Sequence, residues 1–176
     1  MRVLGAQKAL CLSHYFMNEQ ASILQQDDFI AIGEWQGYGA ERVAALLVMD
    51  QHDRLLLKFR DCFTHIAHPG RWSMFGGHVE GSEDLRQTCG REINEELGID
   101  LDLQSLKPFA KYVSDPPKLV DQIFVFTTRE RIQVSQISLG EGAGFGVFTP
   151  MQLKTLDIPR SVRPVIELFI TEYMSS

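Results

Sequence analysis

Three glutamates, Glu92, Glu95 and Glu96, are spaced so that a helix would carry them within about a third of its circumference. Like charges at this spacing repel one another, so a surface helix has little reason to accept them. Mg²⁺ binds carboxylate oxygens and would relieve the repulsion. A Mg²⁺ site, with Mn²⁺ as an alternative ion, is one explanation of the spacing. For the three acids taken alone, a solvated helix face rich in glutamate is the favoured interpretation, and the longer pattern around them reverses that preference.

The acids belong to a longer pattern in which seven residue types keep one register. These residues are Gly77, Glu83, Arg91, Glu92, Glu95, Glu96 and Gly98. A chance match at a given start has a probability on the order of one in a billion. Residues 77–99 resemble a complete Nudix box and depart from it at no specified position. The resemblance implies a Mg²⁺-dependent hydrolase that cleaves a phosphoanhydride bond in a nucleoside diphosphate derivative.

The resemblance also implies a role for each box residue. The three acids of the helix, Glu92, Glu95 and Glu96, correspond to the metal-binding carboxylates, and the backbone carbonyl of Gly77 often adds a ligand. Glu83 and Arg91 correspond to a pair that fixes the loop and the helix relative to each other. A charge-assisted hydrogen bond would do this. An ordinary surface ion pair, worth at most about 1 kcal/mol, is the alternative.

The catalytic base varies within the family, which leaves several candidates. Glu92 and Glu95 are the candidates inside the box. Glu141 is the candidate outside it, in the glycine-rich stretch 139–144, where flexible glycines would let it swing toward a bound metal. A solvated loop acid is the alternative interpretation of Glu141.

Substrate contacts are expected from the strand and loop that lead into the box. Basic side chains there are candidates for phosphate binding, and aromatic ones for stacking on a base, although each aromatic is also a candidate for the core. The candidates are Lys58, Arg60, Arg71, Trp72, Phe75 and Tyr112. The closest general resemblance is to MutT-like enzymes, which predicts a (d)NTP pyrophosphohydrolase acting on a small nucleotide.

Three other functions stay open at this stage. They are hydrolysis of ADP-ribose or a nucleotide sugar, removal of diphosphate from RNA 5′ ends, and nucleotide sensing without catalysis. The formal net charge of -6 and the pI near 5.3 argue against broad binding to nucleic acid. All the box acids are retained, which argues against a non-catalytic sensor.

The elements that must position these residues centre on one helix. Ser82 is the expected N-cap of a helix running to about Leu97, and Gly98 is placed to end it. Its apolar stripe, expected to face a core, consists of Leu85, Cys89, Ile93 and Leu97.

Apolar patterns predict strands on both sides of this helix and two more helices after it. The strands are expected at 29–35, 43–49, 55–59, 109–113, 122–127 and 145–148. Short helices are expected from Thr149-Pro150 and over 162–173. The pattern indicates an α/β protein, and the resemblance implies an α/β/α sandwich with a mixed sheet. We expect an N-terminal extension, 1–28, and a Nudix hydrolase domain, 29–176.

Cysteine usage and hydropathy bear on the compartment. Cys11, Cys62 and Cys89 have no paired spacing, which favours a reducing environment. No stretch approaches the roughly 20 apolar residues of a membrane span, and the N-terminal residues make a poor signal peptide. We expect a cytoplasmic protein without a membrane partner, and a homodimer formed with the extension is one possibility.

Overall fold

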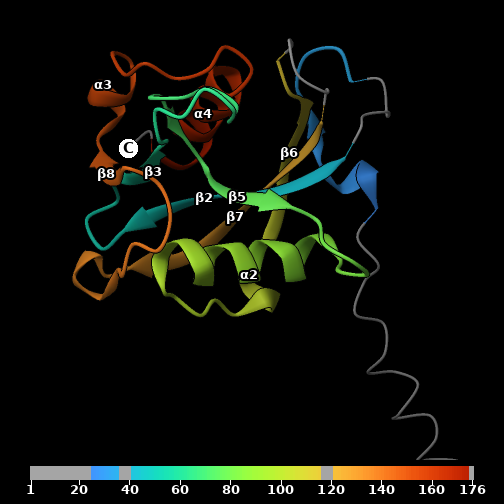
Figure 1. Ribbon diagram of the computed structural model, residues 1–176, viewed down its shortest axis with the longest axis horizontal. Helices are drawn as coiled ribbons and strands as arrows, with labels where there is room; N and C mark the ends of the chain where they lie inside the picture. Colours follow the sequence, from blue (N-terminus) through green and yellow to red (C-terminus); the bar gives the residue numbers. More distant parts are fainter. Residues whose placement is uncertain (1–24, 36–40, 116–120, 175–176) are drawn as a thin grey trace, which may run out of the picture.

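The structure, a computed structural model, describes residues 25–35, 41–115 and 121–174 (Figure 1). Within these residues, eight strands form one mixed sheet. The strands are β1 (Ile30–Ala31), β2 (Arg42–Asp50), β3 (Leu55–Phe59), β4 (Trp72–Ser73), β5 (Phe75–His78), β6 (Lys107–Val113), β7 (Gln122–Ile132) and β8 (Gly144–Phe148). The helices are α2 (Leu85–Leu97), α3 (Pro150–Leu153) and α4 (Arg163–Phe169), with shorter helical turns at Gln26–Asp28, Leu103–Ser105, Val134–Gln136 and Ile170–Met174.

The sheet is built around β2. Its principal order is β1-β6-β7-β2-β3-β4, with β5 paired to β2 and β8 paired to β3. The pairs β2·β7 and β1·β6 are parallel, and the other pairs are antiparallel, so the mixed sheet expected from the sequence is confirmed. In the β2·β5 pair, Gly77 lies opposite Ala44 and Gly76 opposite Ala45. This pairing fixes the residues that enter the helix against the centre of the sheet.

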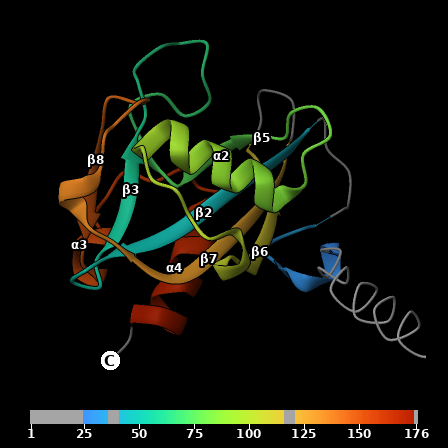
Figure 2. The same cartoon turned by 90° about the horizontal axis from the view of Figure 1, so that it is seen from below.

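Alternation along β2 divides the core into two layers. Ala44, Leu46 and Val48 pack on the side of α2, whereas Ala45, Leu47 and Met49 pack on the side of α4. Successive side chains of a strand point to opposite faces, so a strand buried on both faces reads as a continuous apolar run. Figure 2 shows α2 and α4 on opposite sides of the strands. The α/β/α sandwich is therefore confirmed.

The start of α2 differs from the prediction, and its end does not. Asp84 is the N-cap, rather than Ser82: its carboxylate accepts from the backbone N–H groups of Arg86 and Gln87 at 2.8 and 2.9 Å. The Gln87 side chain returns a hydrogen bond to the Asp84 N–H at 2.8 Å, which completes a capping box. Gly98, at φ 67°, ends the helix as expected. The predicted apolar stripe is buried.

Three other segments differ from the expected ones. The strand predicted over 29–35 is reduced to β1, and the preceding Phe29 packs in the core, edge-on to Phe124 and Phe126. β7 continues to Ile132, well beyond the predicted end. The last helix is α4 followed by a π-helical turn, instead of one helix over 162–173.

Some expectations fall outside the described residues. Most of the predicted extension, 1–24, lies there. In the described part of the chain, no helix is long and apolar enough to cross a membrane.

Candidate functional site

The carboxylates of Glu92 and Glu96 lie between α2 and β5. The Gly76 N–H donates to Glu96 Oε2 at 2.8 Å. A Cβ on Gly77 would overlap the Glu92 carboxylate, so the glycine makes room for that group. Gly76, at φ 136°, approaches the backbone of Ala44 so closely that a Cβ would also overlap there. Both glycines lie in β5, and each is required by one close contact.

Arg91 connects this strand to the helix. Its Nε donates to Glu83 Oε1 at 2.9 Å, and its Nη2 donates to the backbone carbonyl of His78 at 2.9 Å. Its Nη1 reaches Glu92 Oε1 at 2.8 Å and Glu95 Oε2 at 3.0 Å. The hydrogen bond from Arg91 lowers the pKa of Glu83. The contact between Glu83 and Arg91 is the one that the resemblance implied, and the same guanidinium also holds two of the three box acids.

Burial affects the two inner acids more than the outer one. Desolvation raises the pKa of Glu92, against the effect of its hydrogen bond with Arg91. Desolvation also raises the pKa of Glu96, whose side chain is only 1% exposed, against the effect of Lys58. The Glu95 side chain is 56% exposed. Two buried acids of raised pKa require positive charge nearby if both are to ionise.

Glu141 reaches the same place from the loop before β8. The Ser138 N–H donates to the carbonyl of Leu97 at 2.9 Å, and the Gly140 N–H donates to the carbonyl of Glu96 at 3.0 Å. These bonds satisfy carbonyls that the end of α2 leaves without a partner in the helix. A Cβ on Gly140 would overlap the Glu95 carbonyl. The glycines therefore allow close docking on α2, rather than the swinging arm predicted from the sequence.

Lys58 stands between Glu96 and Glu141. It lies on the face of β3 that meets α2, and its ammonium group donates a hydrogen bond to Glu96 Oε1. The same nitrogen is 3.8 Å from Glu141 Oε1. The sequence suggested Lys58 as a phosphate contact. Its partners in the structure are two carboxylates, a pairing that nothing in the local sequence signals.

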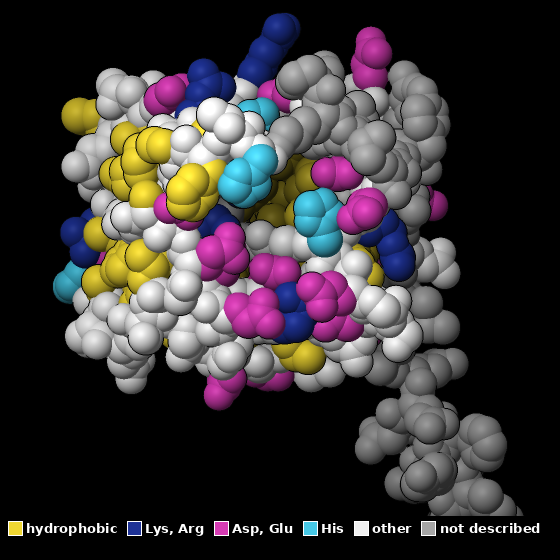
Figure 3. Space-filling model, viewed as in Figure 1, with side chains coloured by type: hydrophobic (Ala, Val, Ile, Leu, Met, Phe, Trp, Pro, Cys, Tyr) yellow, Lys and Arg dark blue, Asp and Glu magenta, His cyan; other side chains and the backbone are white. Residues whose placement is uncertain are grey.

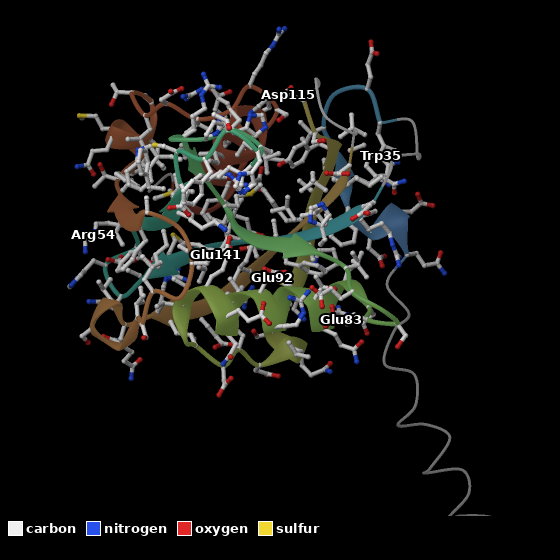
Figure 4. The ribbon with its side chains drawn as sticks, in the orientation of Figure 1. Trp35, Arg54, Glu83, Glu92, Asp115 and Glu141 are labelled. Atoms are coloured by element: carbon white, nitrogen blue, oxygen red, sulfur yellow. The ribbon has the colours of Figure 1, made fainter. Side chains whose placement is uncertain are left out.

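These acids line one part of a cavity of about 820 Å³. Glu92, Glu96 and Glu141 belong to its wall, as do Lys58 and Gly77. Figure 4 shows Glu92 and Glu141 near each other, with Asp115 on the opposite side. Figure 3 shows a hollow on this face, with acidic side chains gathered below it and histidines at its rim. The cavity thus has an acidic end and a chemically mixed end.

The predicted substrate contacts divide into two groups. Arg60 and Tyr112 line the cavity, together with Lys58. Arg71 instead pairs with Asp157 at 3.3 Å. The other two predicted contacts also belong elsewhere: Trp72 packs against Phe59 and Phe148, and Phe75 is fully buried in the core beneath α2. Stacking of Phe75 on a base is therefore ruled out by its position.

Several lining residues were not predicted. His68, Asp115 and Ser161 come from three separate loops. The Ser161 N–H donates to Asp115 Oδ2 at 3.0 Å, whereas the buried Ser161 hydroxyl has no hydrogen-bond partner among the described residues. Burial lowers the pKa of His68, which sits at φ 51°. The His68-Pro69-Gly70 turn was the one available signal, since loops of this kind often carry binding residues.

The acidic end fits a hard divalent cation in its donor chemistry. In the described part of the chain, the side chains form no ready-made cluster of three metal-ligating groups. The reason is visible in the contacts, since Lys58 engages Glu96 and Arg91 engages Glu92 and Glu95. Mg²⁺ does not need such a cluster, because one or two carboxylates, waters and substrate phosphates commonly complete its shell. Glu92, Glu96 and Glu141 offer those carboxylates on one cavity wall.

Comparison with known proteins settles the family. The NUDIX domain model matches residues 40–169, which include all the acids of the site. The chain belongs to the Nudix family. A crystal structure of a MutT protein from Methanosarcina mazei Go1 has a TM-score of 0.64 and 20% identity, covering 77% of this chain and 96% of that one. This likeness shows that the Nudix fold is shared.

Similarity to curated proteins is confined to part of their length. A nucleoside triphosphatase NudI from Enterobacter sp. (strain 638) is 43% identical over 42 residues, which are 24% of this chain and 30% of that protein. An 8-oxo-dGTP diphosphatase from Proteus vulgaris is 34% identical over 59 residues, 34% of this chain and 51% of that protein. The chain thus spans about half or less of these relatives.

Proposed function

We propose that this Nudix protein hydrolyses a phosphoanhydride bond of a (d)NTP in a Mg²⁺-dependent reaction. The observation that carries the proposal is the meeting of Glu92, Glu96 and Glu141 at one wall of an 820 Å³ cavity. Small-molecule sites are typically clefts of about 300–1,000 Å³ with a few polar groups that fix orientation. The printed names of two relatives, a nucleoside triphosphatase and an 8-oxo-dGTP diphosphatase, support the same class.

In the proposed reaction, the acidic end of the cavity binds the cation and the phosphates. Glu92 and Glu96, with Glu95 and the Gly77 carbonyl as further ligands, would hold Mg²⁺, and Mn²⁺ is the alternative ion. A bound cation would polarise the phosphoanhydride and lower the pKa of a coordinated water. Arg91 keeps the Glu92 carboxylate oriented through its 2.8 Å hydrogen bond.

Proton transfer falls to an acid that faces the cavity. Glu92 and Glu141 are in its lining, whereas Glu95 is not. Glu141 is 68% exposed and is therefore open to a water molecule. We infer that one of these two acids, rather than Glu95, takes the proton.

The mixed end of the cavity is proposed to hold the nucleoside. Arg60 is placed for a phosphate, and Tyr112 borders the space beyond it. The Asp115 carboxylate and the unpartnered Ser161 hydroxyl offer polar groups to a ligand. A buried hydroxyl without a partner costs free energy, which a bound nucleoside would recover.

The decisive experiment is a Mg²⁺-dependent hydrolysis screen with products resolved by chromatography. The panel contains NTPs, dNTPs, ADP-ribose, nucleotide sugars and RNA with a 5′ triphosphate. We expect NMP or dNMP and pyrophosphate, and a fall in turnover of two or more orders of magnitude in Glu96→Gln. AMP and ribose phosphate would indicate the ADP-ribose alternative. Nucleotide that binds with Mg²⁺ and survives unchanged would indicate a sensor.

The remaining expectations also stand as proposals. Residues 29–176 are proposed as the hydrolase domain and 1–28 as an extension that can complete a homodimer. A cytoplasmic location is proposed because Cys62 and Cys89, the cysteines of the described residues, form no disulfide with each other. The mass of the protein in solution, measured with and without residues 1–28, tests the dimer.

A further inference from the structure

A lysine is buried in the wall that we assign to the divalent cation. Alternation along β3 points Leu55 and Leu57 into the core on the α4 side, and Leu56 into the core under α2. Lys58, the next residue, follows this alternation onto the α2 side, where its side chain is only 4% exposed. A buried ammonium group is costly unless its charge and its donors are matched. Its partners therefore define its role.

Those partners are acids from two separate segments. The Lys58 ammonium donates to Glu96 Oε1 on α2 and is 3.8 Å from Glu141 Oε1 on the loop before β8. Gly142, at φ 93°, lets that loop lie on the lysine stem, since a Cβ there would be 3.1 Å from Lys58 Cγ and Cδ. The helix and the loop therefore contact the Lys58 side chain from two sides.

The two cations of the site serve different acids. Arg91 pairs with Glu83, which precedes α2, and with Glu92 and Glu95 on α2. Lys58 pairs with Glu96, the most buried of these acids, and with the loop acid Glu141. An arginine fork is rigid, whereas a lysine carries one compact charge on a flexible stem. Of the two cations, Lys58 is the one whose charged end can move away from its carboxylates while the loop and α2 stay in place.

We propose that Lys58 is an internal counter-ion that holds Glu96 and Glu141 together in the metal-free protein and competes with the divalent cation for them. A metal ligated by Glu96 takes Oε1, which accepts from Lys58, or Oε2, which accepts from the Gly76 N–H, and in either case it binds a carboxylate that Lys58 already pairs with. The metal must also bind within a few ångströms of the positively charged Lys58 ammonium group, and this repulsion lowers the affinity for the metal. Lys58 thus lowers metal affinity while keeping the empty site ordered. This inference rests on the metal site of the proposed function.

The first test compares Mn²⁺ binding to the full chain and to Lys58→Met, which keeps the unbranched stem of the side chain and removes the ammonium group with its charge. We expect the dissociation constant, measured by calorimetry or by the electron paramagnetic resonance of free Mn²⁺, to fall at least tenfold. Lys154→Met is the matched control, because Lys154 is exposed and follows α3. It removes the same charge and should leave the dissociation constant unchanged.

The second test measures unfolding of the same proteins without substrate. Metal-free Lys58→Met should melt at a lower temperature than the wild type, because Glu96 stays buried without its partner. Saturating Mn²⁺ should raise the melting temperature of Lys58→Met by more than it raises that of the wild type. Equal increments in the two proteins would contradict the competition.

A measurement on the wild type covers the case in which Lys58→Met does not fold. Reductive methylation of lysines, followed by mass spectrometry, reports the accessibility of each ammonium group. Lys58 should react slowly in the metal-free protein and several-fold faster with Mn²⁺ bound, with Lys154 as the internal reference. A rate of Lys58 methylation that is the same with and without Mn²⁺ would overturn the inference.

The outcomes separate this inference from the proposed metal site. Mn²⁺ that binds the wild type and Lys58→Met equally, or binds the variant more weakly, overturns the counter-ion role and leaves the metal site standing. Absence of Mn²⁺ binding to both proteins overturns the metal site itself and the inference with it.

Discussion

The guanidinium of Arg91 grips the carboxylate of Glu83 with two nitrogens, from Nε to Oε1 at 2.9 Å and from Nη2 to Oε2 at 3.2 Å. The same carboxylate also accepts from the Thr88 hydroxyl at 3.0 Å. The segment before α2 is thereby attached to the first two turns of that helix. A paired geometry of this kind is more specific than a single surface ion pair.

This contact predicts a pH dependence of stability. Arg91 lowers the pKa of Glu83 in the folded protein, so the contribution of Glu83 is present above the pKa of the unfolded state, ordinarily about 4.3, and is lost as the pH falls through the lower folded value. The difference in unfolding free energy between wild type and Glu83→Gln should therefore be largest at pH 6 to 7 and shrink below pH 4. Urea denaturation across this range measures it. A difference that is constant with pH would contradict the assignment.

The two glycines of β5 should respond differently to a methyl group. Gly76→Ala places a Cβ in the backbone of Ala44 at a φ of 136°, which should destabilise the fold by about 1–3 kcal/mol or more. Gly77→Ala instead presses on the Glu92 carboxylate, a side chain that can move. We expect Gly77→Ala to lose at least tenfold in turnover with a smaller loss of stability. Urea unfolding and Mg²⁺-dependent hydrolysis, run side by side, test the contrast.

Docking of the loop before β8 predicts that Gly140 and Glu141 act as one unit. Gly140→Ala would push the loop away from the Glu95 carbonyl and take the Glu141 carboxylate with it. Its turnover should fall about as far as that of Glu141→Gln, and the double variant should fall little further. Gly144→Ala, where a Cβ meets open space, is the control. Full activity in Glu141→Gln would show that Glu141 is an ordinary loop acid.

Substitutions of the two arginines near the box, Arg60 and Arg71, should have different effects on KM. Arg60 lines the cavity, and its Nε donates to the Ala67 carbonyl at 2.7 Å, whereas Arg71 pairs with Asp157. Arg60→Ala should raise KM by about tenfold, since a charged hydrogen bond to a phosphate is worth roughly 1.5–3 kcal/mol. Arg71→Ala should leave KM close to that of the wild type. A larger effect in Arg71→Ala would place the phosphates elsewhere.

Positions set by local periodicity were the ones that the sequence predicted well. The stripe from Leu85 to Leu97 is buried, and Glu92 and Glu96 lie at its edge, because both follow from the helical repeat. The N-cap was placed two residues early. Ser82 and Asp84 are both good caps, and the reciprocal bond from Gln87 favours Asp84.

Positions set by tertiary contact were not predictable in this way. Phe75 precedes two glycines in a strand of four residues, too short a run to show which face it occupies, and it proved to be core. The partners of Lys58 are 38 residues away for Glu96 and farther still for Glu141. Alternation along β3 gives the face of Lys58, and only the docking of α2 and the later loop shows what that face meets.

The hydrogen bonds from Ser138 and Gly140 to the last turn of α2 determine when the site can assemble during synthesis. During synthesis the whole box emerges from the ribosome about forty residues before these two donors. Until β6 and β7 have been made and the chain has returned to α2, the carbonyls at the helix end lack these donors. Glu141 is not yet held beside Glu96. The box residues are contiguous in the sequence, but the site that they form with Glu141 is one of the last parts of the domain to be completed.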